Sequence, residues 1–447
     1  MTEQVKVNHY VLAQLSPEQR SQLLHQRAQD NLQDVEATVR QILAAVRADG
    51  DTALVRLTRQ YDGAELSEDQ LRVSEEEFDR ADTLVEDNLR AALAQAIQNV
   101  RNHHQFQLPP PSWMTEIAPG VMAGERTTPI ASVGLYVPRG KGSFPSVMIM
   151  LCIPAVIAGV PEIVVCTPPG ADGSVDPASL VAARLCGVEN IVKVGGAQAI
   201  AAMAYGTGSV PKVDKILGPG NQYVTAARRI LSSVVDPGPP AGPSESVILC
   251  DAAADVEIAA RELLVEAEHG EDSAVLLVTH SSTLAAGVVD RLADLVASLP
   301  ENRARNCTAV LSHYGGIVIT DGLQDSVAFV NEYAPEHLRV LVDNPFELLP
   351  AITHAGEVLL GDNTSIAFGN FSIGVNAILP TGRNARTYSC MGVGELLKRS
   401  SFAYVSAAGV RSVGPTAVEL AQYEGFPAHA AAAQYIVQRV AEASDGS

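Results

Sequence analysis

The pattern of apolar and polar positions between residues 128 and 235 predicts strands and helices in regular alternation. Short apolar runs rich in Val and Ile are followed by longer stretches in which apolar residues recur at every third or fourth position. This order is typical of a parallel, doubly wound sheet with helices on both faces. The predicted strands are 130–137, 162–167, 190–194 and 213–217, and the predicted helices are 145–158, 177–186, 198–205 and 222–231.

A second alternating series runs from residue 247 to residue 360 and predicts another α/β domain of the same kind. Its predicted strands are 247–250, 274–279, a short one at Ala309, 316–320, 338–342 and 357–360, and its predicted helices are 256–269, 283–299, 325–331 and 345–354. The fold class is therefore α/β, with two doubly wound, Rossmann-like domains.

Helical spacing without strands occupies the regions before and after these series. Helices are expected over 34–47, 52–61 and about 75–106, with Gly50 as a stop, Asp51 as an N-cap and the prolines at 109–111 as a stiff connector. Because these helices have no strands of their own, we expect them to join the second α/β domain. The expected organisation is an N-terminal segment (1–33), an α/β domain from 34–127 plus 245–382, an α/β domain from 128–244, and a C-terminal helical arm (383–447).

Composition and charge restrict the class of partner. The chain has 447 residues, of which 47% are hydrophobic, 18% charged and only 5% aromatic, and its formal net charge is −20. So acidic a chain repels phosphate backbones and anionic lipid heads, and it has no basic stripe to offset that charge. We therefore expect small molecules or other subunits as partners, and neither nucleic acid nor membrane.

No targeting or membrane signal is visible in the sequence. The start has no apolar run of signal-peptide length, and no uninterrupted apolar stretch reaches the length of about 18 residues that a membrane span needs. The six cysteines are scattered singly, without Cys-x-x-Cys spacing. These features predict a soluble, cytoplasmic protein whose cysteines are reduced core residues.

The stretch from Asn331 to Leu338 sets a carboxylate and an imidazole side by side, at a junction of a predicted helix and a predicted buried strand. Pro335 holds this junction, and such junctions host much of the chemistry of α/β proteins. Glu336 and His337 are therefore candidate catalytic acid/base residues. The alternative is an ordinary surface Glu-His pair at the start of a strand.

Three Gly-rich turns each open a predicted helix, at Gly140–Gly142, Gly195–Gln198 and Gly218–Asn221. Backbone N–H groups and helix N-termini would then converge at one edge of the first sheet, which favours binding of an anion or a nucleotide. No Gly-x-Gly-x-x-Gly motif is present. The glycines could equally serve only to make tight turns.

A candidate metal site begins with Glu266 and His269, which are three residues apart and so lie on one helix face. The alternative is an exposed helix end with a histidine near the favourable C-terminal dipole. A Gly-rich loop with amide side chains (369–376) and the segment from Glu424 to His429 offer further oxygen and imidazole ligands. Such a set suits a zinc-like ion in an open, catalytic site.

Seven motifs occur in a fixed order, and together they closely resemble the histidinol dehydrogenase family over nearly the whole chain. They are Gly195-Gly-Ala-Gln-Ala-Ile200, Gly218-Pro-Gly-Asn221, Ala241-Gly-Pro-Ser-Glu245, Ala267-Glu-His-Gly270, Asn331–Leu338, Leu379-Pro-Thr-Gly382 and Glu424–His429. The resemblance implies a homodimer, dependent on zinc and NAD, that oxidises an amino alcohol through the aldehyde to the acid.

The resemblance also implies roles for individual residues. Glu336 and His337 would be the acid/base pair, and Tyr136, Gln198 and Asn221 would contact NAD. The implied metal ligands are Glu266, His269, Asn370 and His429, and the implied substrate contacts are Ser244, His337 and Glu424 together with those four ligands. The arm that carries Glu424 and His429 would reach into the site of the partner subunit.

Three positions depart from the family pattern. The family has glutamine where this chain has Glu266 and aspartate where it has Asn370, so amide and carboxylate are exchanged in opposite directions. Total ligand charge is kept, and we expect an altered but retained divalent site. The family also has a histidine where Ala377 stands, and losing a polar partner weakens selection for a polar substrate.

These observations lead to one expected function and two alternatives. We expect a zinc- and NAD-dependent oxidation of histidinol to histidine. One alternative is a paralogue that oxidises another small amino alcohol or polyol, because substrate and metal positions are changed. The other is a non-catalytic metabolite-binding protein of the same fold, against which the intact Glu336-His337 pair argues.

Overall fold

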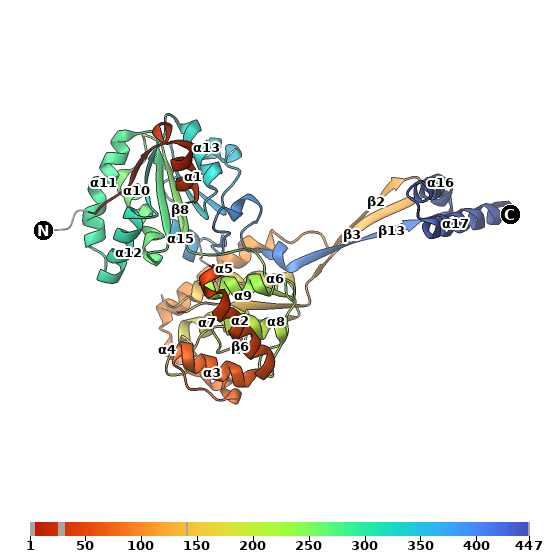
Figure 1. The fold of residues 1–447 in the computed structure, drawn as a ribbon, viewed down its shortest axis with the longest axis horizontal. Helices are drawn as coiled ribbons and strands as arrows, with labels where there is room; N and C mark the ends of the chain where they lie inside the picture. The colour runs from red at the N-terminus through yellow and green to blue at the C-terminus, as the bar shows by residue number, and fades with distance from the viewer. Residues whose placement is uncertain (1–4, 26–31, 140–141, 446–447) are drawn as a thin grey trace. The chain divides into compact units, whose positions relative to one another are not determined.

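The computed structural model describes residues 5–25, 32–139 and 142–445. The chain divides into two compact units (Figure 1). The first comprises Met1–Gln107 and Ala131–Leu396 and contains two parallel sheets; the second comprises Leu108–Ile130 and Leu397–Ser447. No helix among the described residues is long and apolar enough to cross a membrane.

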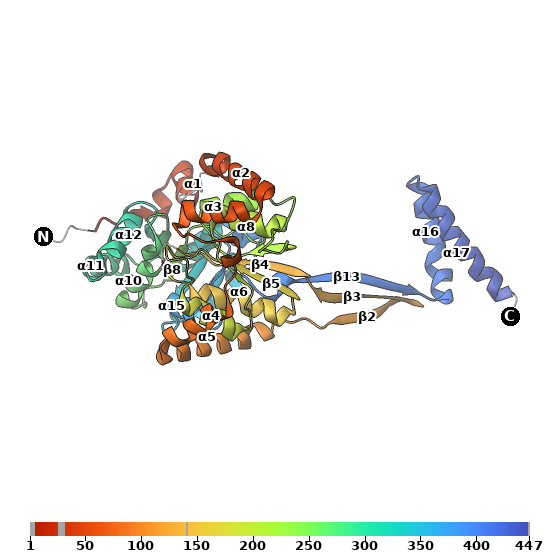
Figure 2. The same ribbon diagram turned by 90° about the horizontal axis from the view of Figure 1, so that it is seen from below.

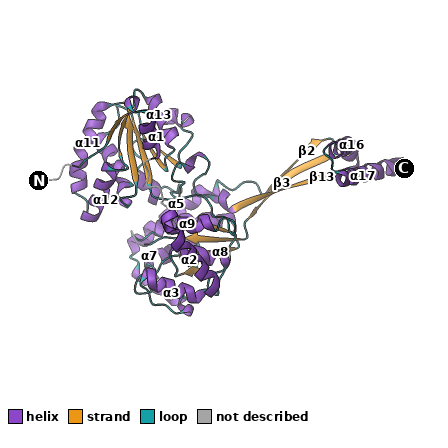
Figure 3. Ribbon diagram, viewed as in Figure 1, coloured by secondary structure: helices purple, strands orange, loops and turns teal. Residues whose placement is uncertain are grey.

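The larger sheet of the first unit has six parallel strands in the order β1-β10-β9-β8-β11-β12. The strands are β1 (His9–Val11), β8 (Glu245–Cys250), β9 (Ala274–Thr279), β10 (Gly316–Ile319), β11 (His337–Leu341) and β12 (Glu357–Leu360). Helices lie on both of its faces (Figure 3). They are α1 (Pro17–His25), α10 (Val256–Val265), α11 (Ser282–Ala297), α12 (Glu301–Ser312), α13 (Leu323–Tyr333), α14 (Pro345–Leu348) and α15 (Ile366–Phe371).

Side chains along each strand alternate between two cores on either side of this sheet. Leu341 packs in one core with α10, α11 and α12, whereas Leu338 and Val340 pack in the other with α1 and α13. Because side chains alternate with a period of two, His337 and Arg339 point to the same face as Leu341. That is the face on which α10 lies.

The smaller sheet of the first unit has four parallel strands in the order β6-β5-β4-β7. The strands are β4 (Ser132–Tyr136), β5 (Glu162–Cys166), β6 (Ile191–Val192) and β7 (Lys215–Leu217), and the helices between and after them are α6 (Pro145–Ala158), α7 (Pro177–Cys186), α8 (Gly196–Tyr205) and α9 (Gln222–Ile230). The alternation predicted from the sequence is confirmed here. Of the three Gly-rich turns, residues 140 and 141 of the first lie outside the described residues.

The helices before Pro109 pack against this smaller sheet and not, as expected, in the other α/β domain. They are α2 (Leu32–Asp49), α3 (Asp51–Asp62), α4 (Glu75–Leu84) and α5 (Asp87–Gln105). Val39 and Leu54 share a core with Tyr136 and Ile200. The reason is that α2 buries its apolar face on α8 and α9, while α4 and α5 pack on α7 and α6, the helices that flank this sheet.

Several local predictions are also corrected by the structure. Ala309 is helical within α12, which the sequence analysis did not predict. The helix expected over 75–106 is two helices, because Val85 adopts an extended conformation after α4. Gly50, with φ of 54°, is the N-cap of α3, and Asp51 is its first residue. Short 3-10 turns complete the first unit at Leu12–Gln14, Glu68–Gln70, Ala267–His269, Leu349–Ala351, Asn384–Arg386 and Val393–Leu396.

The second unit is a three-stranded antiparallel sheet followed by two helices that lie side by side (Figure 2). The strands are β2 (Ser112–Ala118), β3 (Val121–Pro129) and β13 (Leu397–Val405), in the order β13-β3-β2, and the helices are α16 (Ala407–Tyr423) and α17 (Pro427–Asp445). The arm was expected to be mostly helical, and these three strands were missed. Nearly all residues of β2 and β13 are exposed, so the strands carry no apolar alternation to read.

Candidate active site

Glu336 and His337 lie at the junction of α13 and β11, as predicted, and both are buried, with 7% and 3% of their surface exposed. Helix α13 ends at Tyr333, its C-cap Ala334 has a left-handed φ of 51°, and Pro335 prevents the helix from continuing. The chain enters β11 directly afterwards, so both side chains are held between two regular elements. The alternative of an exposed Glu-His pair is therefore wrong.

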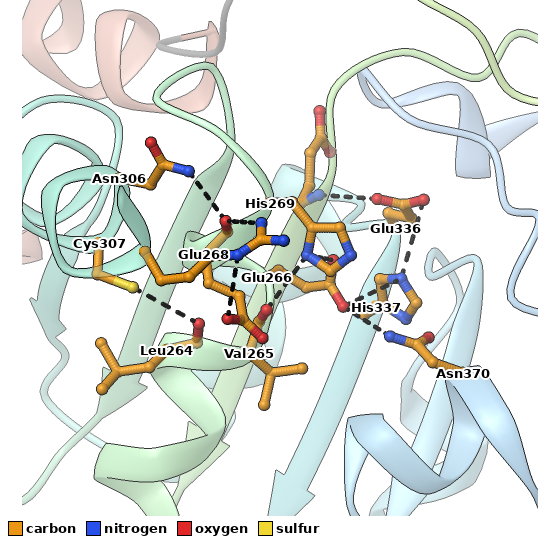
Figure 4. Close-up of polar contacts among 12 residues, drawn as sticks. Leu264, Val265, Glu266, Glu268, His269, Asn306, Cys307, Glu336, His337 and Asn370 are labelled. Atoms are coloured by element: carbon orange, nitrogen blue, oxygen red, sulfur yellow. Dashed lines mark hydrogen bonds and ion pairs between the residues drawn. The ribbon is translucent and has the colours of Figure 1, made fainter. Parts of the chain in front are cut away.

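The pair lies at the amino-terminal edge of the six-stranded sheet. The neighbouring strands β8, β11 and β12 begin at Glu245, His337 and Glu357. Sites in open parallel sheets usually form at the carboxyl ends of the strands, so this placement is unusual. It is made possible by α10, whose C-terminal end brings Glu266 close to the strand starts (Figure 4).

The imidazole of His337 is surrounded by three carboxylates. Its Nδ1 lies 2.5 Å from Oε1 of Glu357, while its Nε2 lies 3.8 Å from Oε1 of Glu336 and 3.9 Å from Oε1 of Glu266. We assign the Nδ1 proton to the short bond with Glu357. The other ring nitrogen, Nε2, then faces the remaining carboxylates and is the one available for proton transfer.

These contacts shift the acidities of both candidate catalytic groups. Burial raises the pKa of Glu336 well above its usual range, and the nearby Glu266 adds to the effect. Burial alone would lower the pKa of His337, but Glu266, Glu336 and Glu357 outweigh it and raise that pKa to about 10. A carboxylate and an imidazole that are both of raised basicity and lie side by side are the groups that general acid/base chemistry needs.

Glu336 is also fixed by a backbone contact. Its Oε2 accepts a hydrogen bond of 2.7 Å from the backbone N–H of Glu245, at the start of β8. The side chain of Glu245 in turn accepts a bond of 2.8 Å from the backbone N–H of Gly382. The loop around Gly382, one of the quoted motifs, thus helps to hold the acid in place.

Glu266 and Asn370, the two positions that depart from the family pattern, are in direct contact. Nδ2 of Asn370 donates a hydrogen bond of 2.9 Å to Oε1 of Glu266 (Figure 4). Glu266 is buried at the end of α10; burial would raise its pKa, but the nearby His337 and His269 hold it below the usual range. Oδ1 of Asn370 is buried and finds no hydrogen-bond partner among the described residues. An orphaned oxygen beside a buried carboxylate is what a cation would need.

His269 is oriented toward the same place. Its Nδ1 lies 3.2 Å from the carbonyl oxygen of Val265 and 3.3 Å from Oε2 of Glu266. If Nδ1 carries the proton, Nε2 keeps a lone pair, which is the usual arrangement of a metal-binding histidine. Among the described residues no three His, Cys, Asp or Glu side chains are grouped as metal ligands would be. A metal here would therefore need Asn370 and a further ligand.

The predicted nucleotide contacts lie at the carboxyl edge of the four-stranded sheet. Tyr136 ends β4, and its hydroxyl accepts a bond of 3.0 Å from the backbone N–H of Gly196. Gln198 is buried in the first turn of α8, whose N-terminus has no side-chain cap. Asn221 caps α9 by accepting from two backbone N–H groups. The turns also need their glycines, since a Cβ at Gly218 would lie 2.1 Å from the carbonyl oxygen of Tyr136.

The remaining predicted residues fall into two groups. The Ser244 side chain lies close enough to Glu266 to help lower the pKa of that carboxylate, so it belongs to the site. Glu424 and His429 lie in the second unit, at the end of α16 and in α17, and both are exposed. The structure does not place that unit relative to the site, and their role stays a prediction.

Glu357 was missed by the sequence analysis, which assigned it only to a strand. A sequence signal existed, because Glu357 is an acidic residue at the first position of the otherwise apolar run Glu-Val-Leu-Leu of β12. Its function could not be read, because pairing of β12 with β11 is not visible in the sequence.

Comparison with known proteins identifies the family. The histidinol dehydrogenase family profile matches residues 25–437. The histidinol dehydrogenase of Synechocystis sp. is 49% identical over 97% of this chain and 98% of its own. A histidinol dehydrogenase homolog of Cereibacter sphaeroides is 51% identical over 95% of this chain and 97% of its own.

A solved structure agrees with these sequence matches. The crystal structure of histidinol dehydrogenase from Elizabethkingia anophelis has a TM-score of 0.91 and 34% identity, and the match covers 97% of this chain and 98% of that one. The resemblance inferred from the motifs is thus confirmed. The chain belongs to the histidinol dehydrogenase family, whose members are NAD-dependent oxidoreductases that act on CH–OH groups.

Proposed function

We propose that this protein oxidises L-histidinol through the aldehyde to L-histidine, with NAD as the hydride acceptor and zinc as the bound metal. The observation that carries the proposal is the buried Glu336-His337 pair, held by α13 and by β11 at a distance of 3.8 Å between Oε1 and Nε2. A relative named histidinol dehydrogenase is 49% identical over nearly its whole length.

The chain's own residues account for the proton transfers of this reaction. In the first oxidation, His337 accepts the alcohol proton through Nε2, the nitrogen that Glu357 leaves free. A cation beside Glu266 would weaken the carboxylate field that holds a proton on this ring. In the second oxidation, Glu336 accepts a proton from the water that attacks the aldehyde. The backbone N–H of Glu245 holds its carboxylate in place meanwhile.

The residues around Glu266 fit a zinc ion. Glu266 and the orphaned Oδ1 of Asn370 offer oxygen, and His269 offers Nε2. His429 of a partner subunit would supply the last protein ligand. A bound zinc would polarise the alcohol and orient the substrate.

The carboxyl edge of the four-stranded sheet fits a dinucleotide. The uncapped N-terminus of α8 offers backbone N–H groups for a phosphate. Gln198 lies in the first turn of α8, Asn221 is the N-cap of α9, and Tyr136 lies at the end of β4. A nucleotide held there would accept the hydride.

We also propose a homodimer in the cytoplasm, with the second unit as the shared arm. The arm exposes many large apolar side chains, among them Trp113, Ile117, Tyr404 and Tyr423. Exposed apolar clusters of this kind mark protein interfaces. The cysteines are all free, which suits a reducing compartment.

The test is NADH formation by the purified protein with zinc supplied, on histidinol, histidinal and a panel of other amino alcohols and polyols. We expect turnover of histidinol with two NADH formed per molecule, as two oxidations require. Preference for another alcohol would make that alcohol, and not histidinol, the proposed substrate. Absence of turnover on the whole panel would favour the non-catalytic alternative. His337→Ala serves as the inactive control.

A further inference from the structure

We propose that Glu357 is a positioning residue, which fixes the ring of His337 and directs its Nε2 toward the reacting alcohol. This inference rests on the proposed function, because it assigns Glu357 a part in the proton transfer of His337. No motif drew attention to Glu357; the pairing of two strands brings it to the site.

The register of the sheet sets the two residues opposite each other. In the parallel pair β11 and β12, His337 is the partner of Glu357, and the backbone N–H of Glu357 donates to the carbonyl oxygen of Glu336 at 3.0 Å. Residues paired in this way point to the same face of the sheet. The carboxylate therefore reaches the ring from a fixed and regular backbone.

The bond between them is short and enclosed. Nδ1 of His337 and Oε1 of Glu357 are 2.5 Å apart, and the two side chains are only 4% and 7% exposed. A charge-assisted hydrogen bond of this length in a buried place is strong and directional. It holds the ring plane and keeps the proton on Nδ1 whether or not Nε2 is protonated.

Among the described residues, the carboxylate of Glu357 has no ion-pair partner besides His337. Its second oxygen, Oε2, is buried and has no hydrogen-bond partner within the part of the chain that the structure describes. The nearest cation along β11, Arg339, approaches Glu262 instead, at 3.8 Å. A buried carboxylate costs stability unless it is paired, so a purely structural role would call for more partners than the one imidazole.

The chain also leaves space for this carboxylate. A Cβ at Gly369 would lie 3.2 Å from each oxygen of Glu357, closer than side chains normally approach. Gly369 therefore allows Glu357 to extend toward His337. A glycine on α15 thus leaves the space that the carboxylate from β12 occupies.

The test compares Glu357→Leu, Glu357→Gln and Glu357→Asp in the full-length protein. Glu357→Leu and Glu357→Gln remove the charge at similar size, and we expect kcat to fall by about 10- to 100-fold while KM changes little. Glu357→Asp keeps the charge and should recover part of the loss. Glu395→Gln is the matched control, because it removes a part-buried carboxylate paired with Lys215 in the same unit.

A second measurement needs no turnover. In protein with 15N-labelled histidine, the Nδ1–H of His337 should give a downfield proton signal that exchanges slowly with water. It is assigned by its absence in His337→Gln, and it should be lost in Glu357→Leu and kept in Glu357→Asp. If the parent protein oxidises none of the alcohols, that result counts against the proposed function. The proton signal alone then tests whether Glu357 positions the ring of His337.

Three results would overturn the inference. The parent protein could lack the signal, the signal could persist in Glu357→Leu, or kcat of Glu357→Leu could stay within about twofold of an active parent. Thermal melting of each variant separates unfolding from loss of positioning, and Glu357→Gln replaces Glu357→Leu if the latter does not fold.

Discussion

At the residue scale, the candidate site is a small group of charges removed from water. Glu266, Glu336 and Glu357 converge on one imidazole at the ends of short, rigid elements. In such a place each charge strongly affects its neighbours, because little solvent screens them. Single substitutions at this site should therefore change individual steps of the reaction and not merely weaken it.

The two candidate catalytic residues should fail in different ways. His337→Ala removes the acceptor of the alcohol proton, so oxidation of the alcohol should slow by about 100-fold or more while the protein still binds substrate. Glu336→Gln should still oxidise alcohol but convert aldehyde to acid poorly. Separate assays with histidinol and histidinal measure this, and equal losses in both half-reactions would contradict the division of labour.

Glu266 and Asn370 should behave as a coupled pair toward the metal. Glu266→Gln alone leaves neutral protein ligands, and Asn370→Asp alone sets a second carboxylate against the first across the 2.9 Å contact. Each should weaken zinc binding, and the double variant should restore it, with coupling on the order of 0.5–3 kcal/mol. Competition with a chelator measures the affinities of all four proteins; additive effects would show that the positions do not share an ion.

Asp62 should make stability depend on pH. Burial raises its pKa to about 6, although Arg139 opposes the shift, and no described residue is a hydrogen-bond partner of its Oδ2. The folded protein thus prefers the protonated form, and stability falls as pH rises from about 4 through about 6. Asp62→Asn mimics that form and should gain about 1 kcal/mol above pH 7, discounted for partial exposure, and nothing near pH 4.

Denaturant unfolding at pH 8 and near pH 4 measures this difference. Asp49→Asn is the matched control, because Asp49 also ends a helix but is exposed. Should Asp62→Asn gain as much at the low pH as at the high one, burial of its charge would not be the cause.

At the element scale, the sequence predicts those helices and strands whose burial requires a regular pattern of apolar residues. The buried strands around Val247 and Val340 read clearly because their neighbours on both faces are apolar. The pair at Glu336 was found because its helix and strand could be predicted from spacing. The hydrogen bond from His337 to Glu357 could not, since nothing in either strand specifies its neighbour in the sheet.

The same reasoning explains which elements were missed. Strands β2 and β13 lie in a sheet whose side chains face solvent, so apolar periodicity is absent. The contact between Asn370 and Glu266 joins α15 to the end of α10, two helices far apart in the chain. The resemblance already implied that both positions hold one metal, and the fold adds that their side chains are in direct contact.

At the scale of the whole molecule, the helices of residues 32–105 were assigned to the wrong sheet. Their apolar faces show that they need a partner but do not say which, and α2 in fact packs on α8 and α9. Chain order was a poor guide, because β1 and α1 belong to the six-stranded sheet while α2 to α5, which follow them, pack with the helices of the other sheet. In a long chain with two similar sheets, a helix with an apolar face could pack with either sheet.

The arm should prove to be shared between subunits. If Glu424 and His429 complete a neighbour's site, His337→Ala and His429→Ala proteins should each be inactive alone. Mixed dimers should regain part of the activity, because one of their two sites would be intact. The control uses differently tagged chains to verify that subunits exchange without unfolding. If exchange is confirmed and activity is not restored, each site is built within one chain.

The pairing of β13 with β3 has a consequence for how the protein is made. Leu397 of β13 pairs with Pro129 of β3, so the hairpin of β2 and β3 leaves the ribosome long before the strand that completes it. At about 5–20 residues per second the delay is on the order of 10–60 s. During that time the unpaired edge of β3 can form hydrogen bonds with a strand of another chain. It is protected only when β13 has been synthesised and pairs with it.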